Sequence, residues 1–340
     1  MRISAAFFHE WVAPLADERL GRTAYAAALL GGGSEVLGLD TDMSADHDWG
    51  PRVTVFVEPA AAADARSIAA DLPDEFDGVS RRFGAAAGGA PWVHPFEVAV
   101  VPDFFEAWVG FHDRSDATLL DWLATPAMSF LAVTGGALFH DGPGQLQVAR
   151  TAAGWYPDDV WRWLTACQWR RIGEEQSFIE RAAKAGDTLG ATVIAARVVR
   201  EAMRLGFLLE ARYAPYSKWL GSAFSTLELA QELVPVLAAA VTSPVGDGPA
   251  SLSSALESLG TLTNERFGLT VDASRRQYFT RAIEVAPADE FSAALLATIT
   301  APRIASLAIT IGNVDMLFGT NNGGFPGARA AYQDILVQRR

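Results

Sequence analysis

The order of short apolar segments in the first 145 residues restricts the fold of this chain more than any other feature. Residues 24–30, 53–57 and 96–101 are apolar and rich in residues typical of strands. Residues 60–83, between the second and third segments, have the periodicity of an amphipathic helix. Strands that alternate with helical segments indicate a layered α/β or α+β domain rather than a helix bundle.

The second half of the chain has a different pattern. A turn signal at His140–Gly144 is followed, from Tyr156 onward, by helical periodicity almost throughout. We predict an α/β (α+β) fold in which a mixed-sheet domain over residues 1–145 is followed by an all-helical domain over residues 146–340. The predicted helices of the second domain cover residues 158–182, 187–211, 217–241, 250–267, 275–283 and 287–311.

Composition excludes several classes of function. With 40 acidic and 27 basic residues the formal net charge is −13, which disfavours general binding to nucleic acids or anionic membranes. The single cysteine, Cys167, cannot form an intrachain disulfide, and the five histidines are too scattered for a zinc site. No apolar run is long enough to span a membrane, and the N-terminal one is too short for a signal peptide. We therefore expect a cytoplasmic protein.

The segment between the first two apolar runs carries the clearest chemical signal. Gly31–Ser34 follows the first run, eleven residues intervene, and Asp46 and Asp48 then precede the second run. Residues two apart on a strand project from the same face, so both carboxylates can bind one divalent cation. The N–H groups of Gly32, Gly33 and Ser34, with the Ser34 hydroxyl, can hold phosphate oxygens. Asp40 and Asp42 have the same spacing but precede no strand, so we interpret them as turn residues.

Gly33, Ser34, Asp46 and Asp48 match the signature of the nucleotidyltransferase superfamily related to DNA polymerase beta, which this chain resembles. In that signature an apolar strand and Gly-[Gly/Ser] precede two acids spaced by one residue on the next strand. More narrowly, GGGSEVLGLD and DHDWGPR, followed later by RYAPYSKWLGSAF, look like a bacterial branch with an uncharacterised helical C-terminal domain. The resemblance implies a magnesium site, with two ions, and a nucleoside triphosphate as substrate.

Members of this superfamily carry a third carboxylate on a later strand, which completes the metal site and can help to deprotonate the attacking hydroxyl. Glu97 is the position that fits, with Asp103 and Glu106 nearby as alternatives. The resemblance thus implies Asp46, Asp48 and Glu97 as metal ligands and catalytic residues. Pro51 departs from the pattern, and because proline removes a ladder hydrogen bond we expect a bulge there.

A cation near the leaving group would complete such a site. Lys218 is our candidate, because the chain uses lysine only twice and a compact ammonium suits a departing pyrophosphate. The alternative is a lysine at a domain seam. Arg212 and Tyr213 lie close by in sequence and are further candidates for nucleotide binding, although aromatic clusters after proline more often pack than stack on a base.

From these features we expect a magnesium-dependent enzyme that transfers a nucleoside monophosphate from a triphosphate to a hydroxyl and releases pyrophosphate. The acceptor is a small hydroxylated molecule or a protein side chain, bound where the helical domain closes over the first. Two alternatives stay open: a nucleotide sensor without turnover, and an interaction protein of the toxin–antitoxin kind with a docking surface on its helical half.

Overall fold

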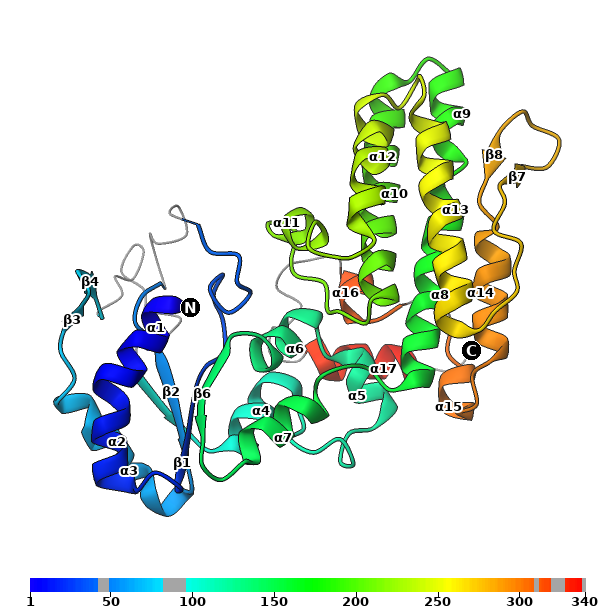
Figure 1. The fold of residues 1–340 in the computed structure, drawn as a ribbon. Coiled ribbons are helices and arrows are strands. Elements are labelled where there is room, and N and C mark those ends of the chain that lie inside the picture. Colours follow the sequence, from blue (N-terminus) through cyan, green and yellow to red (C-terminus); the bar gives the residue numbers. More distant parts are fainter. Residues whose placement is uncertain (42–48, 82–95, 309–311, 319–327, 338–340) are drawn as a thin grey trace. The chain divides into compact units, whose positions relative to one another are not determined.

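In the computed structural model the chain forms two compact units (Figure 1). The structure describes residues 1–41, 49–81, 96–308, 312–318 and 328–337. The first unit contains Met1–Asp121 and Thr125–Gly154, and the second contains Trp122–Ala124 and Trp155–Arg340. The first holds a mixed sheet and the second is mainly helical, so the predicted fold class is confirmed.

A four-stranded sheet in the order β5-β2-β1-β6 is the centre of the first unit. Its strands are β1 (Tyr25–Leu29), β2 (Val53–Val57), β5 (Phe96–Ala99) and β6 (Ala137–Asp141). β1 is antiparallel to β2 and β6, whereas β2 and β5 are parallel. Every residue of β1 and β2 is buried, as their mainly apolar sequences predict.

Helices cover both faces of this sheet (Figure 1). Their bounds are α1 (Arg2–Phe7), α2 (Ala13–Leu20), α3 (Ala62–Ser67), α4 (Val101–Val109), α5 (Leu119–Ala124), α6 (Ala127–Thr134) and α7 (Gln145–Ala152). Phe7 and Val12 pack on one face with Val55. On the other face the Phe104 ring meets the Phe56 ring edge-on, at 5.2 Å between centroids. Alternate residues of β2 therefore serve two separate apolar layers.

The helix predicted over residues 60–83 was wrong in extent. Only α3 and short 3₁₀ turns on either side are helical, and the chain then forms a hairpin of β3 (Glu75–Phe76) and β4 (Val79–Ser80). Asp77 and Gly78 both have positive φ, at 52° and 75°, which is the geometry of a tight hairpin turn. The helical segment thus ends at Ala70, ahead of Pro73, and the Asp-Gly pair forms a hairpin where the alanine-rich sequence favoured a longer helix.

Three other local predictions also need correction. β5 ends at Ala99 because Pro102 lies in the first turn of α4, where proline's missing N–H costs nothing. His140 and Asp141, placed in a turn by the sequence, belong to β6, and the turn begins at Gly142. The bulge expected at Pro51 is absent from the described ladder, because Pro51 precedes β2 and the β1–β2 register is continuous.

The second unit consists mainly of helices packed around α8 (Asp158–Glu175) and α10 (Thr188–Leu209). The others are α9 (Phe178–Lys184), α11 (Leu220–Phe224), α12 (Ala230–Thr242), α13 (Gly248–Phe267), α14 (Ala288–Ala297), α15 (Pro302–Ala305), α16 (Val314–Phe318) and α17 (Ala328–Val337). Three of the predicted helices are each divided in two, and residues 275–283 are not helical. A hairpin of β7 (Arg276–Gln277) and β8 (Glu284–Val285) occupies that segment instead.

Large aromatic side chains fill the core of the second unit. The Trp169 ring stacks on Phe291 at 4.7 Å between centroids, and its indole N–H donates to the Thr263 hydroxyl at 3.1 Å. Cys167, one turn of α8 away from Trp163, is fully buried, and this burial raises the pKa of its thiol far above the usual value. The indole hydrogen bond shows how a tryptophan can be buried without an unsatisfied donor.

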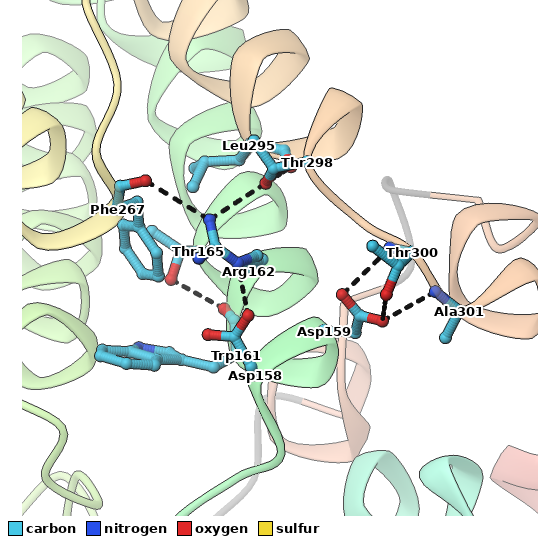
Figure 2. Close-up of polar contacts among 10 residues, drawn as sticks. All are labelled: Asp158, Asp159, Trp161, Arg162, Thr165, Phe267, Leu295, Thr298, Thr300 and Ala301. Carbon is cyan, nitrogen blue, oxygen red and sulfur yellow. Dashed lines mark hydrogen bonds and ion pairs between the residues drawn. The ribbon is translucent and has the colours of Figure 1, made fainter.

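Polar side chains fix the start of α8 to the chain that follows α14 (Figure 2). Asp159 accepts hydrogen bonds from the backbone N–H groups of Thr300 and Ala301, at 3.1 and 2.7 Å, and from the Thr300 hydroxyl at 2.9 Å. Arg162 pairs with Asp158 at 2.7 Å and donates to the Thr298 hydroxyl at 3.1 Å. Two acids in the first turn also complement the helix dipole.

Candidate active site

A cavity of about 410 Å³ lies at one end of the sheet, where β1 ends and where β2 and β5 begin. The antiparallel pairing of β1 with β2, and the parallel pairing of β2 with β5, bring these three strand ends together. Its lining residues are Ala28–Gly32, Arg52–Thr54, Ala62, Arg66, Glu97–Val100, Asp103, Phe104, Ala107 and Trp108. The cavity therefore joins a glycine turn, two arginines and two carboxylates in one unit.

The glycine turn enters the cavity directly from β1. Gly31 and Gly33 have φ values of 90° and 113°, which favour glycine at both positions. The Gly31 N–H donates to the Ala132 carbonyl at 2.7 Å. Within the described part of the chain, the N–H groups of Gly32, Gly33 and Ser34 donate to no backbone carbonyl. Three consecutive N–H groups thus lack a backbone carbonyl partner there; of these residues Gly32 lines the cavity, and Gly33 and Ser34 are not among its lining residues.

A buried ion pair lies behind this turn. The Nε atom of Arg52 is 2.6 Å from Oε1 of Glu35, and the two residues are 3% and 1% exposed. The same guanidinium donates from Nη2 to the Gly32 carbonyl at 2.9 Å. A Cβ placed on Gly33 would lie 3.2 Å from that Nη2 atom, so the turn also passes close to the guanidinium. Burial raises the pKa of the Glu35 carboxyl, and the charge of Arg52 opposes this rise.

Ser4 of α1 holds the other side of Arg52. Its hydroxyl donates to the Gly50 carbonyl and accepts from the Arg52 backbone N–H, each at 3.2 Å. Pro51, between these two residues, has no N–H of its own to pair. The serine side chain thus satisfies the backbone groups on both sides of the proline and fixes the approach to β2.

The carboxylates expected at the site differ in where the structure places them. Glu97 lines the cavity, is exposed, and lies opposite Thr54 in the β2–β5 register. Asp103 of α4 also lines the cavity, whereas Glu106, one turn further on, is not among its lining residues. Asp46 and Asp48 lie outside the described residues. Within the described ranges, no group of three or more histidine, cysteine or acidic side chains is placed to hold a metal ion.

The remaining candidates all belong to the second unit. Tyr213 is buried, with its ring 4.9 Å from that of Trp155 and 5.1 Å from that of Tyr156. Tyr213 therefore packs against aromatic side chains, which was the alternative to stacking on a base. Arg212 donates to the Thr226 carbonyl at 3.3 Å, and the Lys218 ammonium lies 4.8 Å from the Trp219 ring centroid. Their part in nucleotide binding stays a prediction.

Sequence reasoning missed four residues of this region: Glu35, Arg52, Arg66 and Trp108. Glu35 directly follows Ser34 of the glycine turn and Arg52 directly precedes β2, so a charged residue at each end of the motif was the available signal. Arg66 is exposed on α3, and its side chain has no hydrogen bond or ion pair with another described residue. Trp108 of α4 lies 3.6 Å from the Cβ position of Gly31.

Comparison with known proteins adds one partial match. A family model described as a domain of unknown function (DUF4037) matches residues 122–220, less than a third of the chain. The matched segment contains α6, β6 and α7 of the first unit and α8 to α10 of the second. It contains neither the glycine turn nor Glu97. No curated protein matches this chain. In the described part of the chain, no helix is long and apolar enough to cross a membrane.

Proposed function

We propose that the protein is a magnesium-dependent nucleotidyltransferase that moves a nucleoside monophosphate from a nucleoside triphosphate to a hydroxyl group. One observation carries this proposal: Gly32, whose N–H donates to no backbone carbonyl in the described part of the chain, lines the same cavity as Glu97, and Gly33 and Ser34 follow it directly. Phosphate binding and carboxylate chemistry are the two requirements of this reaction, and β1, β2 and β5 bring both to one end of the sheet.

The donor set of the cavity fits magnesium. Mg²⁺ prefers carboxylate oxygens and keeps substrate phosphates among its ligands, and Glu97 supplies one exposed carboxylate. Asp46 and Asp48 are the proposed further ligands, on the resemblance given above. When bound, two such ions would stabilise the charge that develops on the attacking and leaving oxygens.

The chain's own residues have three tasks in the reaction. The Gly32–Ser34 N–H groups bind phosphate oxygens, and Arg66, exposed at the cavity, neutralises the charge that builds up on pyrophosphate. Glu97 accepts the proton of the acceptor hydroxyl. The acceptor oxygen bonds to the α-phosphorus as the bond from that phosphorus to the bridging oxygen breaks, and pyrophosphate leaves with that electron pair. Lys218, Arg212 and Tyr213 remain proposed contacts from the second unit.

The test is pyrophosphate release from each of ATP, GTP, CTP and UTP with Mg²⁺, in the presence of a metabolite extract that is monitored for mass gain. We expect one triphosphate to be consumed, and Asp48→Asn to abolish the release. Glu106→Gln is the matched control, because Glu106 is an exposed acid of α4 outside the cavity lining. Release that is the same in the Asp48→Asn variant contradicts the mechanism.

The same experiment separates the enzyme from a nucleotide sensor. A sensor would bind a triphosphate at the glycine turn, with a measurable dissociation constant, but would release no pyrophosphate with any extract. Asp103→Asn is a useful companion variant, because Asp103 is the other described acid of the cavity lining. If it reduces release more than Glu97→Gln does, Asp103 is the proton acceptor.

A further inference from the structure

The two arginines of the cavity differ in their surroundings. Arg66 is exposed, whereas Arg52 is buried and already bonded at three points. The Arg52 guanidinium binds the Glu35 carboxylate and the Gly32 carbonyl, and its backbone N–H binds Ser4. A guanidinium with its fork directed at two protein acceptors is poorly placed to bind a phosphate as well. The role of Arg52 therefore follows from the groups that it binds.

What Arg52 holds is one peptide plane of the glycine turn. The peptide bond is planar and trans, so the Gly32 C=O and the Gly33 N–H point in opposite directions. The 2.9 Å bond from Arg52 to the Gly32 carbonyl therefore directs the Gly33 N–H away from the guanidinium. Neither glycine has a Cβ to resist rotation of this plane, so the sequence alone allows both orientations.

Glu35 in turn holds the guanidinium. Its Oε1 atom accepts from Nε at 2.6 Å, next to the Nη2 atom that donates to the Gly32 carbonyl. Within the described residues its second oxygen, Oε2, is buried and makes no hydrogen bond, but it lies 3.7 Å from the N-terminal ammonium of Met1. Glu35 therefore holds the guanidinium through Oε1 alone.

We propose that Glu35 and Arg52 are positioning residues that orient the glycine turn for binding a polyphosphate. The inference rests on the proposed function and deepens it, because it names the part of the substrate that the pair serves. The pair fixes the direction of the Gly33 N–H before the ligand arrives. A flipped peptide would present a carbonyl oxygen where a donor is needed, and would repel phosphate.

The test uses variants that keep every formal charge. Arg52→Lys retains the cation but replaces the two-acceptor fork by a single ammonium, and Glu35→Asp retains the anion but shortens its reach. Arg171→Lys and Glu201→Asp are the matched controls, because this second ion pair, at 3.3 Å, joins a buried glutamate to a half-buried arginine in the other unit. The probes are inorganic pyrophosphate and ATP, each titrated calorimetrically with Mg²⁺ present.

We expect Arg52→Lys and Glu35→Asp to weaken pyrophosphate and ATP binding by about tenfold each, the loss of roughly one charge-assisted hydrogen bond. The control variants should bind both probes as the unaltered protein does, even if they melt at a lower temperature. Binding of adenosine should be the same in all five proteins, because adenosine lacks the polyphosphate. A purely structural pair would change melting temperature without this selectivity.

Three results would each overturn the inference. Folded Arg52→Lys and Glu35→Asp variants that bind pyrophosphate with unaltered affinity contradict it while leaving the proposed function intact. If those variants do not fold, amide hydrogen exchange of the unaltered protein decides, because pyrophosphate should protect Gly32–Ser34 and absence of protection contradicts the inference. An unaltered protein that binds neither probe overturns the proposed function, and this inference with it.

Discussion

Glu35 and Glu201 are both buried glutamates paired with an arginine, one in each unit, and they differ in what the paired arginine holds in place. Glu201 accepts from the Gln168 amide at 2.7 Å and from Arg171 at 3.3 Å, and a second arginine lies near its other oxygen. Glu35 is bonded through one oxygen to Arg52, which lines the cavity, and its other oxygen lies 3.7 Å from the Met1 ammonium. The same ion-pair chemistry thus joins two helices in one unit and holds a backbone turn beside a cavity in the other.

Loss of a carboxylate in each unit gives the largest expected contrast. Glu97→Gln should lower the rate of pyrophosphate release at least about a hundredfold, because it removes a metal ligand or proton acceptor from the cavity. Glu201→Gln should leave that rate unchanged at a temperature where the variant is folded. Equal rates of pyrophosphate release for Glu97→Gln and the unaltered protein would contradict a role of Glu97 in the reaction.

A core substitution in the second unit should affect stability alone. Trp169→Ala removes a buried ring that stacks on Phe291, and we expect it to lower the free energy of unfolding by about 3–5 kcal/mol. Urea unfolding followed by circular dichroism measures this loss. Trp11→Ala is the control, because Trp11 is 41% exposed. A change in pyrophosphate affinity of folded Trp169→Ala would show that the second unit influences the glycine turn.

Alanine substitutions at Gly136 and Gly144 test how tightly β1 and β6 are packed in the first unit. A Cβ on Gly136 would lie 1.8 Å from the Leu29 carbonyl oxygen, whereas nothing lies within 4 Å of one on Gly144. Both have positive φ, at 63° and 75°, so they share the backbone cost of substitution. We expect Gly136→Ala to destabilise by about 3 kcal/mol and Gly144→Ala by about 1 kcal/mol. Equal losses in urea unfolding would mean that β1 and β6 can separate at little cost.

The smallest expected effect is at the start of α8. Burial raises the pKa of Asp159, but its three hydrogen bonds from Thr300 and Ala301 outweigh this and lower the pKa below the usual value. The contribution of Asp159 to the free energy of unfolding is therefore complete above about pH 3.9, the pKa of an unfolded aspartate. This contribution is lost as pH falls through the lower pKa of the folded state. Asp159→Asn should cost about 1 kcal/mol at neutral pH.

The pH dependence provides the check on that prediction. Because asparagine does not titrate, the free-energy difference between the two proteins should shrink as pH falls below 3.9, which urea unfolding at pH 7 and pH 3 measures. A difference that is constant with pH would show that the hydrogen bonds do not depend on the charge of Asp159.

Local sequence patterns predicted the parts of the fold that depend on local properties. Strands β1, β2 and β5 are mainly apolar runs, and the helices of the second unit have clear periodicity. The errors came from competing local signals. Residues 60–83 are alanine-rich, but the helical segment ends at Ala70, ahead of Pro73 and the Asp77–Gly78 turn. Residues 275–283 close a hairpin through the Tyr278 N–H and the Ile283 carbonyl.

The site was harder to predict because its geometry depends on long-range pairs. The sequence indicated the glycine turn and Glu97, which the structure places at one cavity, but not the contacts behind them. Arg52 binds Glu35 across 17 residues and Ser4 across 48, and no periodicity reports such contacts. An arginine after a proline looks like a surface charge until the fold encloses it.

The single thiol of the chain can report on the opening of the second unit. Cys167 is enclosed within α8, and burial holds its pKa so high that the reactive thiolate is scarce in the folded protein. A maleimide can therefore label the chain only during excursions that expose this helix. Labelling kinetics would time the opening of the helical half in unmodified protein, with no engineered probe and no competing site to subtract.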